Sequence, residues 1–390
     1  MTNNKKSQSI IYVNFSPYEN AGRILDYLKD TFKYVFLFSF NFHKLGRTRR
    51  SNKLYVFRKK KVVQKLNLYQ IPVPRKLVFL LLPIRSMLIF VQILLYSSYL
   101  KNKYSQIDYY FTVNAFTAWV GLVIKRFGFV KNTVFWVWDY YPPLHDDRII
   151  MFMRKIYWQF DKIGTNSDRL VFLNKRLKEL RERTGILKKE IKSSIVPIGT
   201  ETKFPGKRPQ KNSMTLCFIG VLKKSQGLDL VFQNLPKLQK LYHQLRIEII
   251  GSGPDENYFK NLAKNSTAKI NFYGFLGENQ NKKISTIFSN SSVGIATYVP
   301  EKSNVSYYGD PSKIKMYLSF GLPVITTNVF TFSEEIRETK SGVIINYYRK
   351  GEFIRAINKI NHNYANYQAN AKKLAKKYFY KHLYRSMFED

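Results

Sequence analysis

Strand-like apolar runs alternate with helical segments along almost the whole length of the 390-residue chain. Parallel strands need a crossover between them and a helix is the usual crossover, so this alternation predicts an α/β fold with helices on both faces of a parallel sheet. The second half is regular enough for a complete doubly wound domain. We expect its strands at 214–219, 245–250, 269–273, 293–297, 323–326 and 343–345, and its helices near 228–242, 257–264, 279–288, 312–320 and 352–360.

The first half repeats the pattern less regularly, and the chain is too long for one hydrophobic core. Strands are expected at 9–15, 34–40, 107–112, 134–138, 170–173 and 194–198, and helices near 23–29, 77–100, 116–126, 149–160 and 175–183. Residues 202–213 (TKFPGKRPQKNS) have a linker composition. We therefore expect an N-terminal Rossmann-like domain over 1–201, a linker over 202–213, a C-terminal Rossmann-like domain over 214–363, and a C-terminal helix over 364–390 that can pack back on the first domain.

The chain carries 65 Lys and Arg against 26 Asp and Glu, a net charge of +39. A charge of this size favours an anionic partner: a membrane surface, a nucleic acid or a phosphorylated substrate. The single cysteine, Cys217, excludes an intrachain disulfide and a cysteine-rich metal site, and fits a reducing compartment. With only five histidines in addition, we expect no metal centre.

Residues 77–100 are long and apolar enough to cross a bilayer. Pro83, Arg85 and Gln92 interrupt the segment, and basic residues flank both of its ends, so the positive-inside rule gives it no orientation. A buried or interfacial helix, which we favour, and a membrane span both remain open. No cleavable signal peptide is expected, because the apolar run after Ser7 is too short. We therefore expect a cytoplasmic protein, peripheral at the inner face of the cell membrane.

Three strand-to-helix turns of the second half combine glycines, helix starts and lysines. Ligands of α/β folds bind at the carboxyl ends of strands, where helix N–H groups and lysines attract anions. Each turn alone is also typical of an ordinary α/β connection, but three at one sheet edge favour a shared site. The candidate residues are Gly220, Lys223 and Lys224 in the first turn, Gly251 and Gly253 in the second, and Asp310, Ser312, Lys313 and Ile314 in the third.

Four segments of the second half follow one another in a specific order. They are 218–229 (FIGVLKKSQGLD), 249–254 (IIGSGP), 272–275 (FYGF) and 311–325 (PSKIKMYLSFGLPVI), the last of which ends in a Gly-x-Pro-Val-Ile block. In this order and spacing the segments resemble the group 1, family 4 glycosyltransferases. The resemblance covers most of the second half and is looser in the first.

The resemblance implies the GT-B fold, in which two Rossmann-like doubly wound domains face a cleft. It implies transfer of a hexose from a nucleotide-sugar, a co-substrate rather than a cofactor, to an acceptor hydroxyl, without a metal and with retention. Lys223 or Lys224, together with Ser312 and Lys313, would neutralise the leaving diphosphate. The net charge and the 77–100 helix add to what the resemblance implies. We therefore expect a saccharide or lipid-linked saccharide as acceptor, a role in cell-envelope polysaccharide biosynthesis, and an anionic membrane surface as partner.

The sequence also departs from the family pattern. Two glutamates of the family are replaced by Tyr308 and Met316, and methionine cannot hold the ribose hydroxyls that the second glutamate binds. An arginine and a lysine of the first turn are replaced by Val221 and Gln226. Either another carboxylate, Asp310 or Glu301, takes over, or the donor site is degraded and the protein is noncatalytic.

In the first half, Asp139 follows an apolar strand-like run, so we expect it at the carboxyl end of a strand. It is the candidate catalytic base, with a turn-forming or capping role as the alternative. Tyr140 and, more weakly, His145 are the other candidate acceptor-side residues. Gly22 resembles a family glycine that meets donor phosphates, although a plain turn glycine fits equally well.

A nucleic-acid binder is the rival from another class. Its support is the basic clusters 47–50 and 58–61 and the basic, aromatic tail. No ordered RNA- or DNA-binding motif accompanies them. We therefore favour the glycosyltransferase, with Lys313 and Asp139 as its candidate catalytic residues.

Overall fold

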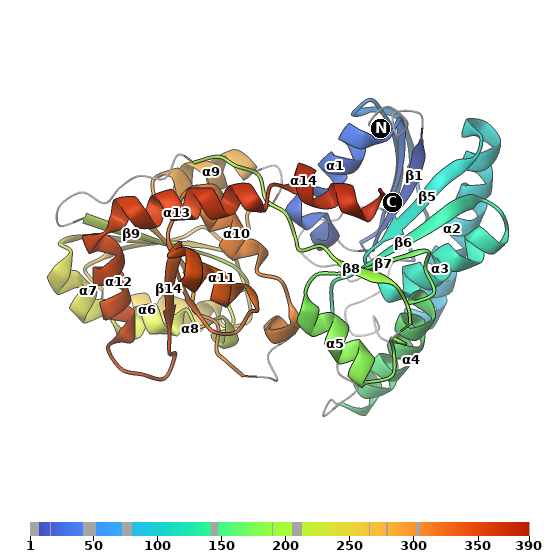
Figure 1. The fold of residues 1–390 in the computed structure, drawn as a ribbon. Helices are drawn as coiled ribbons and strands as arrows, with labels where there is room; N and C mark the ends of the chain where they lie inside the picture. Colours follow the sequence, from blue (N-terminus) through green and yellow to red (C-terminus); the bar gives the residue numbers. More distant parts are fainter. Residues whose placement is uncertain are drawn as a thin grey trace. The chain divides into compact units, whose positions relative to one another are not determined.

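The computed structural model describes residues 8–15, 17–41, 52–71, 80–141, 147–188, 190–204, 213–264, 266–277, 280–301 and 305–389. The chain forms two compact units (Figure 1). Unit 1 comprises residues 1–197 together with 383–390, and unit 2 comprises residues 198–382. The division therefore falls four residues before the boundary expected from the linker composition. The expected C-terminal helix is divided as well, with residues up to His382 in unit 2 and the last eight in unit 1.

Unit 1 is built on an eight-stranded sheet in the order β4-β3-β2-β1-β5-β6-β7-β8. Six strands are parallel, and β3 and β4 run antiparallel to their neighbours at one edge. The strands are β1 (Ser9–Asn14), β2 (Tyr34–Ser39), β3 (Lys53–Arg58), β4 (Lys61–Asn67), β5 (Ile107–Thr112), β6 (Val130–Val137), β7 (Arg169–Phe172) and β8 (Ser193–Ile195). The β3–β4 hairpin is an addition to the strands expected from the sequence.

Helices cover both faces of this sheet (Figure 1). The helices are α1 (Ile24–Thr31), α2 (Leu82–Tyr104), α3 (Ala115–Arg126), α4 (Arg148–Gly164) and α5 (Lys175–Arg183). One face carries α2, α3 and α4, and its core includes Phe36, Ile93 and Val120. The other face carries α1 and the end of the chain, where Phe388 packs on Phe32.

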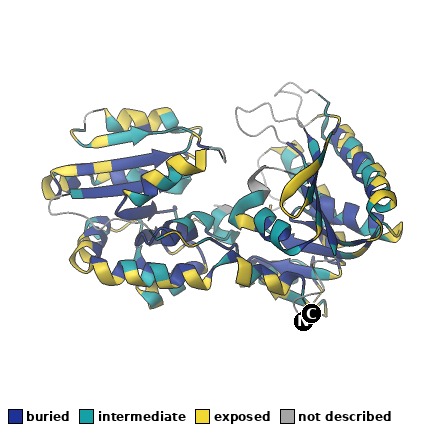
Figure 2. Cartoon of the chain, turned by 90° about the horizontal axis from the view of Figure 1, so that it is seen from above, coloured by how far each residue is buried: buried dark blue, intermediate teal, exposed yellow. Residues whose placement is uncertain are grey.

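Unit 2 has a six-stranded, fully parallel sheet in the order β11-β10-β9-β12-β13-β14. The strands are β9 (Ser213–Ile219), β10 (Gln244–Ile250), β11 (Lys269–Phe272), β12 (Val293–Ala296), β13 (Val324–Thr327) and β14 (Gly342–Ile345). The central strands β9, β12 and β13 are buried on both faces, which explains their nearly continuous apolar sequences (Figure 2). The order reverses between β9 and β12, so this is the switch point at which doubly wound sheets bind ligands.

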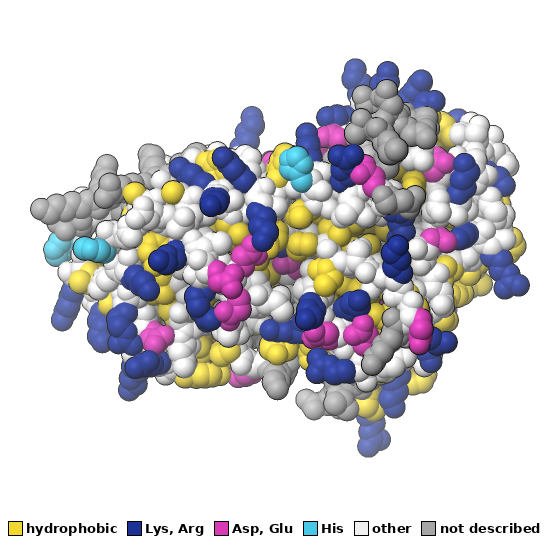
Figure 3. Space-filling model, in the orientation of Figure 1, with side chains coloured by type: hydrophobic (Ala, Val, Ile, Leu, Met, Phe, Trp, Pro, Cys, Tyr) yellow, Lys and Arg dark blue, Asp and Glu magenta, His cyan; other side chains and the backbone are white. Residues whose placement is uncertain are grey.

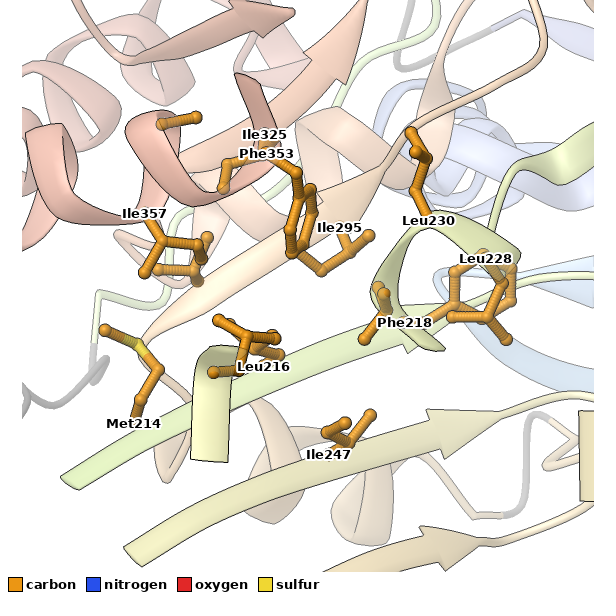
Figure 4. Close-up of a cluster of buried hydrophobic side chains, with 14 of the residues drawn as sticks. Met214, Leu216, Phe218, Leu228, Leu230, Ile247, Ile295, Ile325, Phe353 and Ile357 are labelled. Atoms are coloured by element: carbon orange, nitrogen blue, oxygen red, sulfur yellow. The ribbon is translucent and has the colours of Figure 1, made fainter. Parts of the chain in front are cut away.

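The helices of unit 2 complete the doubly wound domain. They are α6 (Asp229–Gln233), α7 (Leu235–Leu241), α8 (Glu256–Ala263), α9 (Asn281–Ser289), α10 (Ser312–Ser319), α11 (Phe332–Thr339), α12 (Glu352–His362), α13 (Tyr364–Lys377) and α14 (Tyr380–Leu383), the last of which reaches into unit 1. Leu216, Ile247, Ile295 and Ile357 belong to the core that joins helices to sheet (Figure 4). Helix α11 was not expected from the sequence, and the expected helix over 228–242 is divided at Asn234.

Candidate functional site

The ammonium group of Lys313 lies at the switch point of the unit 2 sheet. Lys313 is the second residue of α10, and its Nζ donates a hydrogen bond to Oε1 of Gln226 at 3.0 Å. It lies 5.7 Å from the ring centre of Tyr298, just after β12, and directly against the backbone of Gly220, just after β9. The side chain therefore places a cation where the two central strands end.

This cation is poorly solvated. Lys313 is half-buried, and burial lowers the pKa of its ammonium group from 10.5 to about 8. The group therefore still carries its charge at neutral pH, in surroundings where water screens that charge weakly. An anion that enters this position gains a strong charge-assisted hydrogen bond.

Glycines bring the turns after β9 and β10 into direct backbone contact. Gly220 N donates to Ile250 O at 2.9 Å, and Leu222 N donates to Ser252 O at 3.1 Å. Gly251 has a φ of 136°, and a Cβ on it would collide with the carbonyl oxygen of Gly220. A Cβ on Gly253 would collide with the backbone of Leu222. The structure thus brings Gly220, Gly251 and Gly253 together and gives Gly251 and Gly253 a steric reason, whereas a Cβ on Gly220 would meet the end of the Lys313 side chain.

The two lysines of the first turn lie farther out than Lys313. Both Lys223 and Lys224 are exposed. The ammonium of Lys224 lies 4.5 Å from the ring centre of Tyr258, and its backbone N–H donates to Asp255 Oδ2 at 2.8 Å. These lysines add positive charge near the turn, whereas Lys313 supplies the cation inside it.

Asp310 has partners of its own within unit 2. Its carboxylate forms a buried ion pair with Lys315 at 2.6 Å and accepts a hydrogen bond from Ile198 N. Lys315 also donates to Ile198 O at 2.9 Å. Burial raises the pKa of Asp310 and lowers that of Lys315, and the attraction between the two charges opposes both shifts. These contacts fasten the first segment of unit 2 to α10 and occupy both carboxylate oxygens.

Of the other residues of α10 that the sequence singled out, some lie near the candidate anion site and one lies in the hydrophobic core. Ser312, at the helix start, is half-buried, and its N–H donates to Asp310 O at 2.8 Å. The side chain of Ile314 is fully buried, so only its backbone remains to meet a ligand. Met316, where the family has a glutamate, is half-buried and follows Lys313 by one helical turn.

In unit 1, Asp139 lies two residues beyond the end of β6, as expected for a residue at the carboxyl edge of the sheet. Tyr141 donates a hydrogen bond to Asp139 Oδ2 at 3.3 Å, and Arg181 donates to the backbone oxygen of Asp139 at 2.7 Å. The residue is solvent-exposed, yet the protein atoms packed around its carboxylate raise its pKa, against the opposing effects of Tyr141 and Arg181. Tyr140 is buried beside Trp158, and His145 lies outside the described residues.

Arg181 fixes the position of the turn that contains Asp139. Its guanidinium forms an ion pair with Asp161 of α4 at 2.8 Å, and both side chains are at most 2% exposed. Because the same guanidinium binds the Asp139 backbone, the position of Asp139 depends on α4 and α5.

Gly22 lies in the turn after β1 in unit 1. Its φ of 71° is in the left-handed region that favours glycine. Its carbonyl oxygen accepts a hydrogen bond from the Tyr384 hydroxyl at 2.7 Å, a contact with the end of the chain. The turn is thereby fixed within unit 1.

Several of these contacts could not be found by reading motifs. Gln226 and Lys313 are 87 residues apart, and Asp310 and Ile198 are 112 apart. For the contact between Gln226 and Lys313, the one signal in the sequence was that Gln226 occupies a position where the family has a lysine. Among the described residues no group of three or more His, Cys, Asp or Glu is placed to hold a metal ion.

Comparison with known proteins relates unit 2 to a family and the whole chain to a fold. Residues 199–378 match the family model for glycosyl transferases group 1, whereas no curated protein sequence matches the chain. A structure of trehalose-6-phosphate synthase, from work on glycosyltransfer with retention, superposes with a TM-score of 0.63 at 16% identity and covers 97% of each chain. HepE of Anabaena in complex with UDP gives 0.60 at 12% identity, covering 95% of this chain and 96% of that one.

The lipopolysaccharide outer core galactosyltransferase WaaB in its apo form gives a TM-score of 0.59 at 14% identity and covers 98% of each chain. At such identities these likenesses show the fold, and they confirm the expected GT-B architecture. Residues 199–378, which make up nearly all of unit 2, therefore match the group 1 glycosyltransferases, and the whole chain has the GT-B fold of such enzymes.

Proposed function

We propose that the protein transfers a hexose from a nucleotide-sugar to a hydroxyl of a saccharide or lipid-linked saccharide in cell-envelope polysaccharide biosynthesis. The observation that carries the proposal is the ammonium of Lys313 at the switch point of unit 2. A nucleoside diphosphate is the anion that group 1 enzymes release. UDP is bound in the HepE structure, which supports a uridine nucleotide as the first donor to test.

In the proposed reaction, the bond between the sugar and the diphosphate breaks and negative charge develops on the leaving phosphate. The Lys313 ammonium neutralises that charge, helped by the N-terminus of α10. A charge-assisted hydrogen bond of this kind contributes about 1.5–3 kcal/mol. This local cation takes the place that a metal ion has in other transferases, so we propose a metal-independent reaction.

Asp139 is the proposed catalytic carboxylate of the acceptor side, with Tyr140 beside it. A raised pKa makes this carboxylate a stronger base toward an acceptor hydroxyl. We propose retention of configuration, by analogy with the trehalose-6-phosphate synthase work. The likeness to WaaB supports a cell-envelope acceptor by the same kind of analogy. For such an acceptor we propose that the enzyme is cytoplasmic and acts at the inner face of the membrane.

A noncatalytic relative is the second candidate, because Met316 cannot hold ribose hydroxyls as the family glutamate does. It predicts a folded protein that no nucleotide stabilises. The transferase predicts that a nucleoside diphosphate raises the melting temperature, since a ligand that binds only the folded state stabilises it. A thermal-shift panel of nucleoside diphosphates and their sugars therefore distinguishes the two.

The decisive test compares three variants in donor binding and donor hydrolysis. Lys313→Ala should weaken diphosphate binding and cut turnover by about tenfold or more. Lys224→Ala, which removes an exposed lysine of the same site, should change both by less. Asp139→Asn should abolish transfer and leave diphosphate binding intact. Unchanged turnover in Lys313→Ala would refute the assignment, and a salt-sensitive gel shift with nucleic acid in place of donor binding would favour the rival class.

A further inference from the structure

Helix α4 of unit 1 exposes an apolar row to solvent. Ile149, Phe152, Ile156 and Ile163 are 64%, 62%, 43% and 40% exposed. Their spacings of three, four and seven residues place them on one side of the helix. The residues on the other sides of the helix include the buried Asp161 and Gly164 and half-buried aromatic side chains such as Phe160. The row is therefore an uncovered face of a packed helix.

Helix α2 exposes a second apolar row. Ile84, Met87, Leu95 and Tyr99 are 58%, 60%, 63% and 38% exposed, and Leu80 just before the helix is 74% exposed. Among the described residues α2 is the one helix long and apolar enough to cross a membrane. An exposed apolar stretch this long on a soluble surface marks an interaction site.

The two rows belong to one layer of helices. Phe90 of α2 stacks on Trp119 of α3 at 5.2 Å, and Phe160 of α4 packs on the same Trp119 at 5.3 Å. Helix α3 thus lies between α2 and α4 on one face of the sheet (Figure 1). We call the solvent side of α2, α3 and α4 the helical face.

The helical face is strongly basic. The three helices contain nine Lys and Arg, of which Arg85 is buried and Lys125 pairs with Asp168, and a single acidic residue, Asp161, which is buried in its ion pair with Arg181. Arg148, Lys155 and Lys162 form a basic row beside the apolar row of α4, each directly preceding one of its isoleucines. Lys and Arg are also spread across the side of the molecule drawn in Figure 3.

We propose that the helical face docks on the surface of an anionic lipid bilayer, with the apolar rows in the headgroup region and the basic row on lipid phosphates. An amphipathic helix with adjacent apolar and basic rows lies in the plane of such an interface. The proposal depends only on unit 1 and is independent of the donor chemistry of unit 2.

The helix α2 lies on the bilayer in this arrangement and does not cross it. Ile89, Ile93 and Leu100 are buried in the core of unit 1, and a crossing helix would have to remove them from it. Gln92 also accepts a hydrogen bond from Tyr69 N at 2.6 Å and donates one to Tyr69 O at 3.2 Å. These contacts hold the inner side of α2 on the protein.

Charge selects the bilayer over a second copy of the chain. A symmetric dimer through the helical face would bring two basic rows together, and like charges across an interface oppose association. Lipid phosphates instead supply the opposite charge along the whole face. The apolar rows add a contribution that salt does not screen.

The test is flotation of the full-length protein with vesicles of phosphatidylcholine, with and without phosphatidylglycerol. The wild type should float with the anionic vesicles, and high salt should weaken but not abolish the binding. The double variant Phe152→Glu/Ile156→Glu should reduce partitioning by more than about tenfold. The triple variant Arg148→Ala/Lys155→Ala/Lys162→Ala should remove most of the dependence on anionic lipid.

Controls separate docking from folding. Leu241→Glu alters a residue of unit 2 that is 44% exposed and should leave flotation unchanged. The melting temperature of each variant shows whether it is folded; if the double variant fails to fold, the triple variant and the single Ile163→Glu variant carry the test. Thermal shift with UDP reports on unit 2 separately, so the failure of donor binding and the failure of docking are distinguishable.

Four results would overturn the proposal. The first two are absence of flotation with anionic vesicles and undiminished flotation of the folded variants. The third is resistance of the bound protein to an alkaline carbonate wash, because it would mean that α2 spans the membrane. The fourth is a concentration-dependent dimer in ultracentrifugation that the Phe152→Glu/Ile156→Glu substitutions dissociate.

Discussion

Lys313 combines two properties that rarely occur together, a charge at neutral pH and little solvation. A folded-state pKa of about 8 against an ordinary value of 10.5 means that the unfolded chain binds more protons at this group between these two pH values. Its contribution to the free energy of unfolding therefore rises with pH across that window and is constant below it. The energy lost by desolvating the ammonium is recovered when an anion pairs with it.

We expect diphosphate binding to depend on pH through this group. Below about pH 8 the ammonium is already charged, whereas at higher pH binding must take up a proton. The affinity for UDP should therefore fall by up to about tenfold per pH unit above pH 8. Calorimetric titrations of the protein with UDP at pH 7 and above pH 9 measure this change in affinity. Lys313→Ala should lose the pH-dependent step and Lys224→Ala should keep it; a step that persists in Lys313→Ala would assign it to another group.

The Asp310–Lys315 pair illustrates a different role for buried charge. Lys315→Met would leave the Asp310 carboxylate buried without a cation, which costs about 3–5 kcal/mol in the free energy of unfolding of unit 2. The double variant Asp310→Asn/Lys315→Met should recover part of this loss. Urea denaturation measures both. Lys260→Met, which breaks the exposed pair with Glu256, is the control and should cost less than about 1 kcal/mol. Equal effects of Lys315→Met and Lys260→Met would refute a structural role for the buried pair.

At the scale of elements, the turns after β9 and β10 are one structural piece. Gly251→Ala combines an unfavourable φ with a collision against the Gly220 carbonyl. Because the Gly220 backbone lies against the Lys313 ammonium, the substitution should displace the anion site as well as destabilise unit 2. Gly274→Ala is the control, since it has a φ of 65° but open space around a Cβ, and should cost only about 1 kcal/mol. Thermal melting and UDP binding measure the two effects, and UDP binding that survives Gly251→Ala would separate this turn from the site.

Regular elements could be predicted where burial on both faces leaves a continuous apolar run. The central strands of unit 2, β9, β12 and β13, lie within two residues of their expected bounds for this reason. The β3–β4 hairpin was missed because its two turn residues, Lys59 and Lys60, have positive φ values of 47° and 72° where Asn and Gly are usual. Helix α11 was missed because its eight residues include few apolar side chains.

The candidate site was predictable only in part, for a related reason. A glycine-rich turn or a helix start is visible as a local motif, so Gly220, Gly251 and Lys313 could be assigned to one sheet edge. Pairing between distant side chains has no local signal. Neither the Gln226 contact of Lys313 nor the Asp310–Lys315 pair could be read from spacing.

At the scale of the whole molecule, the chain ends by returning to the unit in which it began. Residues 383–390 belong to unit 1, although residues 198–382 intervene in unit 2. Tyr384, Met387 and Phe388 are at most 1% exposed. The rings of Tyr27, Phe32, Tyr109 and Phe111 lie around Phe388, with centres 5.4–6.0 Å from its own. The last residues are therefore part of the core on the α1 face of unit 1.

We expect Phe388→Ala to lower the free energy of unfolding of unit 1 by about 3–5 kcal/mol, because it opens a cavity among four aromatic rings. Deleting residues 383–390 should cost more, since it also removes Tyr384 and its hydrogen bond to Gly22 O. Hydrogen exchange localises the effect: amides of β1 and β5 should exchange faster, whereas those of β9 and β12 should not change. Tyr348→Ala, at a residue that is 66% exposed, is the control and should shift neither set. Faster exchange confined to unit 2, or none in β1 and β5, would mean that the end of the chain does not stabilise unit 1.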